Sequence, residues 1–226
     1  VAAPPADAQK LRADIESYLK AAENPPVHGE IVAAIVPHAG YVYSAPVAAH
    51  AYKALAANLA QQNESAAGLD AIFLLAFSHR ASHPRVSVLP KGAMETPLGR
   101  AVVSEELAHQ FMDFAHNTSF IEEVFIGEHS AEVQVPFLQV LFPKVPIVPV
   151  IFGQQSAANI EAVVAGLEAV AKSRRILVIA TTDLSHYRPY KNACGLDSET
   201  LNVLLKGDPR HSAGSSSLSA TTPKGT

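Results

Sequence analysis

The sequence predicts an α/β fold with a largely parallel central sheet and helices on both of its faces. Three observations lead to this prediction: short continuous apolar runs recur along the chain, amphipathic helical patterns separate them, and polar turns follow them. Continuous apolar runs are typical of strands covered on both faces, and helical connections between such strands favour parallel pairing.

The length and composition are those of one globular domain. The chain has 226 residues, of which 48% are hydrophobic and 17% are charged. These values support a single domain over residues 1–209. A low-complexity tail is expected over residues 210–226, where Ser, Thr, Ala and Gly follow neither a helical nor a strand pattern.

Composition also limits the partners and the location of the protein. The net charge is −4 and no basic stripe is present, so we expect no nucleic-acid partner. No apolar run is long enough to span a bilayer and no signal peptide opens the chain, so a soluble cytoplasmic protein is expected. The single cysteine, Cys194, cannot form an internal disulfide, which fits a reducing compartment.

The first predicted element is a helix over residues 7–22, in which apolar residues recur at helical spacing and Asp7 is placed to cap the N-terminus. A continuous apolar run over residues 31–36 predicts the first buried strand. A helix over residues 44–59 follows, and its first turn accommodates Pro46.

The second buried strand is predicted over residues 71–77. Shorter runs over residues 85–89 and 100–103 predict a small antiparallel pair, joined through a turn at residues 96–99. A helical pattern then covers residues 104–116.

The last part of the chain alternates in the same way. Its predicted elements are a helix over 130–142, a strand over 147–152, a helix over 156–171, a strand over 176–180 and a helix over 196–205. Pro136 interrupts the first of these helices, because proline is poorly tolerated in a helix interior.

Histidines follow three of the four predicted core strands. His38 and His79 come just after the first and the second strand, and Asp183 and His186 come after the fourth. Because the carboxyl ends of parallel strands meet at one edge of a sheet, we expect these residues at a common edge. Three imidazoles there can share one zinc, copper or iron ion, and Asp183 can orient one of the rings. Taken singly, each histidine is better explained as a surface or structural loop residue.

Glu128 and His129 add a carboxylate and a fourth imidazole just before the next helix. The alternative for this segment is helix capping, with Ser130 as the N-cap and Glu132 in the first turn. From the residues alone, capping is the favoured interpretation.

Four segments together resemble the motifs of the Memo-like family. They read Val-Pro-His-Ala-Gly-Tyr-Val-Tyr-Ser over residues 36–44, Ser-His-Arg over 78–80, Glu-His-Ser-Ala-Glu-Val-Gln-Val-Pro-Phe over 128–137 and Thr-Asp-Leu-Ser-His-Tyr over 182–187. The family includes protein B of the AmmeMemoRadiSam system. It is related in fold to class III extradiol dioxygenases, which cleave catechol rings at a non-haem iron.

The resemblance implies a metal site and catalytic residues. The implied metal ligands are His38, His79 and His186. The implied catalytic residues are His186, Glu128, His129 and Asp183, of which His186 matches the acid/base of the dioxygenase relatives. Iron or copper is the implied metal, and zinc is the alternative.

One departure from the family concerns the third metal ligand. Members of the family continue beyond the region of residues 207–209 with a Cys-Gly segment that supplies this ligand, and Cys194 does not stand in an equivalent place. His186, Asp183 or a neighbouring subunit would then complete the coordination. An uncovered sheet edge would favour a homo-oligomer.

Three functions remain open at this point. The leading hypothesis is a non-haem iron or copper oxidoreductase, dioxygenase-like, that acts on an unidentified small molecule. The second is a non-catalytic module that binds a metal or a protein partner, and the third is a zinc-dependent hydrolase with His186 or Glu128 as base. Neither common phosphate-binding glycine loop is present, and the Gly-x-Ser-x-Gly motif is also absent.

Overall fold

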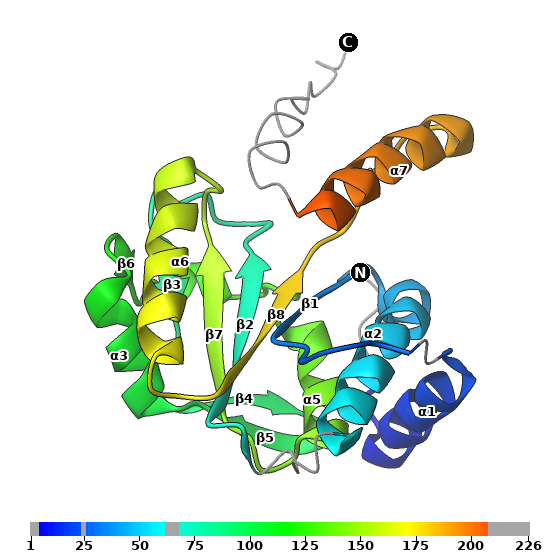
Figure 1. Cartoon of the computed structure of the whole chain (residues 1–226), viewed down its shortest axis with the longest axis horizontal. Coiled ribbons are helices and arrows are strands. Elements are labelled where there is room, and N and C mark those ends of the chain that lie inside the picture. Colours follow the sequence, from blue (N-terminus) through cyan, green and yellow to red (C-terminus); the bar gives the residue numbers. More distant parts are fainter. Residues whose placement is uncertain (1–4, 24–25, 62–67, 208–226) are drawn as a thin grey trace. The chain divides into compact units, whose positions relative to one another are not determined.

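A computed structural model describes residues 5–23, 26–61 and 68–207 of the chain (Figure 1). It divides into two units, Val1–Thr182 and Asp183–Thr226, and each is described by itself. Residue 209, the predicted end of the domain, and the predicted tail over residues 210–226 lie outside the described residues.

Helices and strands alternate along the first unit, and the second unit contributes one long helix. The strands are β1 (Ala33–Val36), β2 (Ala71–Phe77), β3 (Val86–Val88), β4 (Ala93–Thr96), β5 (Gly99–Val102), β6 (Thr118–Ser119), β7 (Ile147–Phe152) and β8 (Ile176–Thr181). The helices are α1 (Ala8–Ala21), α2 (Tyr41–Gln61), α3 (Glu105–Phe114), α4 (Glu122–Phe125), the 3-10 turn η2 (Glu132–Gln134), α5 (Val135–Leu141), α6 (Ala157–Ala171) and α7 (Tyr190–Lys206).

The central sheet confirms the predicted fold class. Its order is β1-β8-β2-β7-β3-β6, and the four strands from β1 to β7 in this order are parallel. These four strands are the predicted core strands. The largely buried side chains of β2, β7 and β8 explain their continuous apolar runs, whereas β1 buries only Val36, so the strand predicted as buried over residues 31–36 is half-exposed. The carboxyl ends of the four parallel strands lie at one edge of the sheet.

The helices of the first unit cover the two faces of the sheet. The chain steps in one direction from β1 through β2 to β7 and steps back from β7 to β8. Right-handed crossovers therefore put α2 and α5 on one face and α6 on the other. Side-chain contacts agree, because Phe73 of β2 packs against Phe111 of α3, which runs along α6. Tyr52 of α2 stacks on Phe137 of α5.

One end of this sheet is only partly covered. β1 is an edge strand, and Ile35 is 51% exposed. Ile35 pairs with Ala180 of β8, which is half-buried. Val178, two residues earlier on the same face of β8, is also half-buried. An apolar edge of this kind favours association with another chain, and the expected homo-oligomer stays a prediction.

The predicted antiparallel pair is wrong in its partners. Residues 85–89 do not pair with residues 100–103. Instead β3 joins the central sheet, antiparallel to β7, and β4 pairs with β5 in a separate hairpin. All three residues of β3 are buried, which a strand on a half-exposed hairpin would not show.

Two predicted helices that contain a proline begin at other residues in the structure. The predicted helix over residues 130–142 is a short 3-10 turn followed by α5, and Pro136 lies in the first turn of α5, where no N–H is needed. α2 starts at Tyr41, before Pro46, because the carbonyl of Gly40 already accepts from the N–H groups of Tyr43 and Ser44.

Close packing between the loops after β2 and β7 gives a testable expectation. A Cβ atom at Gly153 would lie 2.5 Å from the carbonyl oxygen of His83 and 2.8 Å from its backbone nitrogen. Gly153→Ala is therefore expected to lower the free energy of unfolding by about 1–3 kcal/mol, because backbone has to shift. Urea unfolding measures the difference.

Gly195→Ala in α7 is the matched control. No heavy atom lies within 4 Å of the added Cβ, so this variant is expected to be neutral or stabilised by up to about 1 kcal/mol. Equal stability of the two variants would contradict the close approach of Gly153 to His83.

The second unit consists mainly of α7, which extends the predicted helix over 196–205 toward the N-terminus. It ends at Gly207, whose left-handed φ of 64° is typical of a helix C-terminus. The carboxylate of Asp197 accepts from the backbone N–H of Ser185 at 2.9 Å and so ties the segment before the helix to it.

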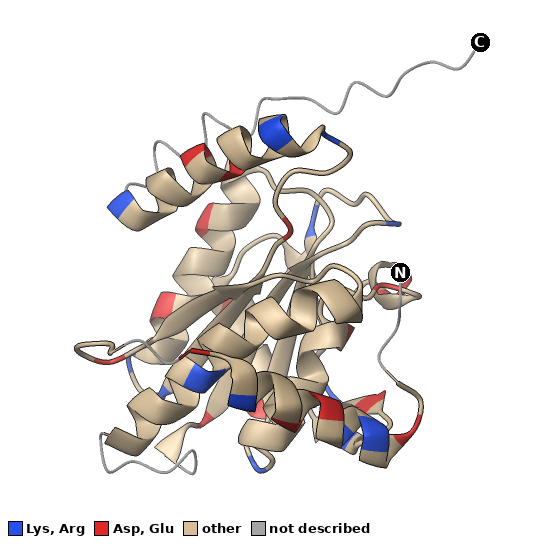
Figure 2. Ribbon diagram, turned by 90° about the vertical axis from the view of Figure 1, so that its right-hand side faces the viewer, with Lys and Arg blue, Asp and Glu red and all other residues tan. Residues whose placement is uncertain are grey.

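No helix among the described residues combines the length and the apolar character that crossing a membrane requires. In the view of Figure 2, Lys and Arg positions and Asp and Glu positions both occur on the described helices.

Candidate metal centre

His38 lies in the turn between β1 and α2 and is buried. Hydrogen bonds fix this turn on both sides of the histidine. The carbonyl of Pro37 accepts from the side-chain amide of Gln134 at 2.9 Å, and the carbonyl of Ala39 accepts from the Ser44 hydroxyl at 2.8 Å. The position of the imidazole therefore follows from the backbone of the turn.

His79 follows β2 and is partly open to solvent, with 36% of its side chain exposed. Its backbone N–H donates to Oε2 of Glu128 at 2.6 Å, and its ring atom Nδ1 lies 3.0 Å from Oε1 of the same carboxylate. Two contacts to one carboxylate hold both the main chain and the ring.

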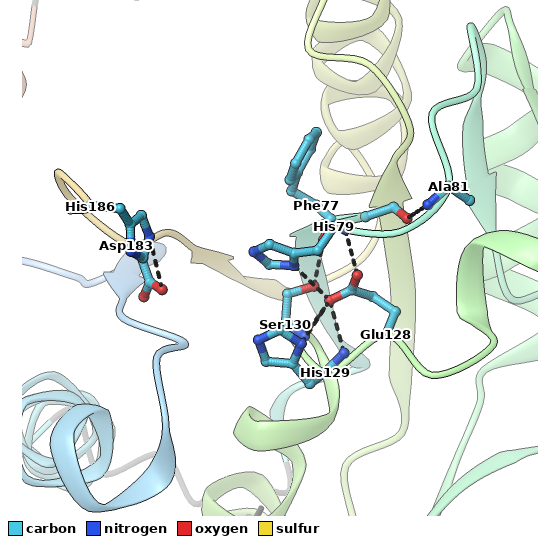
Figure 3. A network of polar contacts seen from close by, with 9 residues as sticks. Phe77, His79, Ala81, Glu128, His129, Ser130, Asp183 and His186 are labelled. Carbon is cyan, nitrogen blue, oxygen red and sulfur yellow. Dashed lines mark hydrogen bonds and ion pairs between the residues drawn. The ribbon is translucent and has the colours of Figure 1, made fainter. Parts of the chain in front are cut away.

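Glu128 is a buried carboxylate at the centre of the cluster (Figure 3). Besides the contacts to His79, its Oε1 accepts from the backbone N–H groups of His129 and Ser130, both at 2.8 Å. Burial raises the pKa of the Glu128 carboxyl, but the hydrogen bonds from the backbone of His79 and Ser130 outweigh it and lower the pKa to about 2. The group is therefore an anion at neutral pH.

Three imidazoles surround this region. The ring centroids of His79 and His129 are 4.7 Å apart and the rings are stacked. The ring of His38 stands edge-on to both, at 5.2 Å from His79 and 6.1 Å from His129. Nitrogen and oxygen atoms of His79, Glu128 and His129 lie within 4.8 Å of one another, close enough to share one metal ion.

Two consecutive buried hydrogen bonds connect Tyr52 through Gln134 to the turn that carries His38. The hydroxyl of Tyr52 donates to Oε1 of Gln134 at 3.0 Å, and the amide nitrogen of Gln134 donates to Pro37. Both side chains are fully or almost fully buried. Sequence reasoning missed this role, although a glutamine within an otherwise apolar buried segment was a usable signal.

Replacement of Gln134 should therefore lower the free energy of unfolding more than removal of the Tyr52 hydroxyl does. Tyr52→Phe is expected to lower the free energy of unfolding by about 1 kcal/mol, and Gln134→Ala by about 2–4 kcal/mol, because it leaves two buried groups without partners. Urea unfolding of each variant gives both values. The control is the exposed residue Gln154, whose change to alanine should stay within about 0.5 kcal/mol. Equal effects of Tyr52→Phe and Gln134→Ala would contradict the bridging role.

Asp183 and His186 belong to the second unit. Within it, Nε2 of His186 lies 3.5 Å from a carboxylate oxygen of Asp183 (Figure 3). Their roles as a metal ligand and as catalytic groups stay predictions.

The structure brings four of the predicted residues together in the first unit: His38, His79, Glu128 and His129. The capping interpretation of Ser130 is wrong. Its hydroxyl donates to the carbonyl of Phe77 at 2.7 Å, and no side chain caps η2. The segment after Glu128 is thereby fastened to the end of β2.

Comparison with known proteins shows the family of the chain. The family model described as Memo-like protein matches residues 2–222. The chain belongs to the Memo-like family. The resemblance of the four motifs is therefore confirmed, and the cluster contains residues of three of them.

Several archaeal relatives carry the name MEMO1 family protein. The one from Sulfurisphaera tokodaii is 36% identical over 179 residues, which is 77% of this chain and 60% of the relative. The one from Metallosphaera sedula is 38% identical over 159 residues, or 69% of this chain and 54% of the relative. The one from Pyrobaculum arsenaticum is 32% identical over 212 residues, or 90% and 73%. The chain thus spans about 60% of the length of the Memo-like relative from Sulfurisphaera tokodaii.

The donor set of the cluster fits a divalent transition metal. Imidazole nitrogens and a carboxylate are ligands that iron, copper and zinc accept. The partial exposure of His79 leaves a path for the ion, and the anionic Glu128 favours a cation nearby.

Proposed function

We propose that this Memo-like chain binds one redox-active metal ion at the cluster of His38, His79 and His129 and acts as a dioxygenase-like oxidoreductase on a small molecule. Iron or copper is the proposed metal. The single observation that supports the proposal most is the convergence of three imidazoles around one buried anionic carboxylate at the carboxyl ends of parallel strands. Ligands bind in the same place in many folds of this class.

The residues have separate tasks in this proposal. The imidazoles hold the ion, and Glu128 offsets part of its charge and fixes the ring of His79. The resemblance to the family assigns proton transfer to His186, with Asp183 as its partner. A bound iron or copper ion supplies one-electron chemistry with dioxygen, whereas zinc would supply an activated water.

Metal analysis and oxygen uptake test the proposal. The purified chain is loaded with iron(II), copper or zinc, freed of excess metal and analysed for its elements. We expect about one ion of iron or copper per chain. Oxygen consumption with a panel of catechols is then compared between loaded and chelator-treated protein.

Each outcome separates two functions. Oxygen uptake that requires the loaded metal supports the oxidoreductase. Retention of zinc, but of neither iron nor copper, would contradict the dioxygenase-like function and favour the hydrolase. Failure to retain any ion would leave a non-catalytic binding module as the function of the chain.

A further inference from the structure

The hydrogen bonds of Glu128 decide which part of the cluster can receive a metal. A carboxylate offers about four lone-pair positions. Oε2 of Glu128 accepts from the backbone N–H of His79, and Oε1 accepts from the N–H groups of His129 and Ser130 and contacts Nδ1 of His79. Four donors therefore contact the carboxylate, three of them at Oε1 and one at Oε2, and its side chain is only 1% exposed.

The same contact fixes the proton of the His79 ring. Oε1 of Glu128 already accepts from two backbone N–H groups, so Nδ1 of His79, 3.0 Å away, has to be the donor of their contact. In the neutral ring the other nitrogen, Nε2, then carries the lone pair that a metal requires.

The orientation of the two stacked rings of His79 and His129 supports the same assignment. Nδ1 of His129 lies 3.5 Å from the Glu128 oxygen that Nδ1 of His79 contacts, and the ring planes differ by 26°. In Figure 3 the second nitrogen of each ring points away from Glu128, toward the same side. Both Nε2 atoms are thus presented together.

We infer that Glu128 is a positioning residue that holds the His79 ring with its proton on Nδ1, so that the ring offers Nε2 to the metal. The inference rests on the proposed metal-binding function, because only a metal site needs the free Nε2 atom. The tautomer of the His79 ring can nevertheless be measured without metal. The rival arrangement is a facial set of His79 Nδ1, His129 Nδ1 and a Glu128 oxygen, since both Nδ1 atoms lie within 3.5 Å of Oε1. That arrangement would have to break the contact between Nδ1 of His79 and Glu128.

Nuclear magnetic resonance of the nitrogen-15-labelled full chain tests the inference. Long-range correlations between ring protons and nitrogens are recorded on chelator-treated protein at about pH 8, where an ordinary imidazole is neutral. The signals of His79 are assigned by their loss in His79→Gln. We expect one tautomer, protonated at Nδ1, and on addition of zinc a shift of the lone-pair signal of Nε2.

The outcomes are distinct. A ring protonated at Nε2, or a mixture of tautomers, would overturn the inference, and so would zinc binding through Nδ1. A pure Nδ1–H tautomer in a chain that binds no zinc would support the positioning role of Glu128 while contradicting the proposed metal centre.

Glu128→Gln provides the second readout. Its amide can donate as well as accept, so the tautomer of His79 is no longer imposed, and zinc affinity is expected to fall about 10–100-fold. Glu132→Gln, which alters an exposed carboxylate of the same segment, should change neither the tautomer nor the affinity. Unchanged tautomer and affinity in a folded Glu128→Gln protein would contradict the inference. If this variant does not fold, the measurement on the unaltered chain still decides.

Discussion

The His38→Ala/His79→Ala double variant is expected to retain no metal under conditions in which the unaltered chain retains about one ion. Loss of a residue that only orients a metal ligand usually costs 10–100-fold in affinity. Loss of two ligands should therefore cost more than about 100-fold and leave the variant without metal after desalting. Elemental analysis and competition with a chelator measure the difference.

The control for this result is a second pair of histidines. His109 and His116 lie on α3 and just after it, outside the cluster, and are not buried. His109→Ala/His116→Ala should bind metal as the unaltered chain does. His79→Ala alone is a further check, because His79 is half-exposed and its replacement disturbs the core less than that of the buried His38. Equal metal content in all four proteins would contradict the assignment of His38 and His79.

Glu128→Gln is expected to lower the free energy of unfolding by about 3 kcal/mol at pH 7. The glutamine imitates the protonated acid, so the expected loss equals the free energy that links ionisation to folding. The folded-state pKa of about 2 lies below the ordinary glutamate value of 4.5. This difference corresponds to about 3 kcal/mol.

The direction of this pKa shift predicts how the free energy of unfolding depends on pH. A lowered folded-state pKa stabilises the protein above the pKa of the unfolded chain, and the contribution is lost as the pH falls from about 4.5 toward about 2. The gap between the unaltered chain and Glu128→Gln should therefore shrink to about half or less at pH 3. Urea unfolding at several pH values measures it, with Glu161→Gln, which alters an exposed carboxylate of α6, as the control. A gap that stays constant with pH would contradict a buried, ionised Glu128.

The strands of the core were predictable because burial on both faces leaves an unbroken apolar run. That holds for β2, β7 and β8, and the residues that follow β1 and β2 gave His38 and His79 as candidates. The small strands were not predictable in the same way. β3 and β4 are short runs with similar patterns, and only packing against β7 decides which of them joins the central sheet.

The role of Glu128 could not be read from its neighbours in the sequence. Two of its four donors, the main chain and the ring of His79, lie 49 residues away, and the other two are backbone N–H groups. Backbone donors leave no mark on residue type, so helix capping was the simpler interpretation. Likeness to the family motif, rather than spacing, singled this residue out.

The place of β8 between β1 and β2 has a consequence for the time course of folding. Among the described strands, β1 pairs only with β8. The backbone N–H of Thr182, just after β8, donates to the carbonyl of Val36, just before the His38 turn. During synthesis, His38 leaves the ribosome long before β8 exists, and a long intervening loop has to close before β1 has a neighbour. Such distant pairings form slowly. His79, Glu128 and His129 can therefore assemble first, and the His38 turn takes its place among them only once the strand made from residues 176–181 has been inserted.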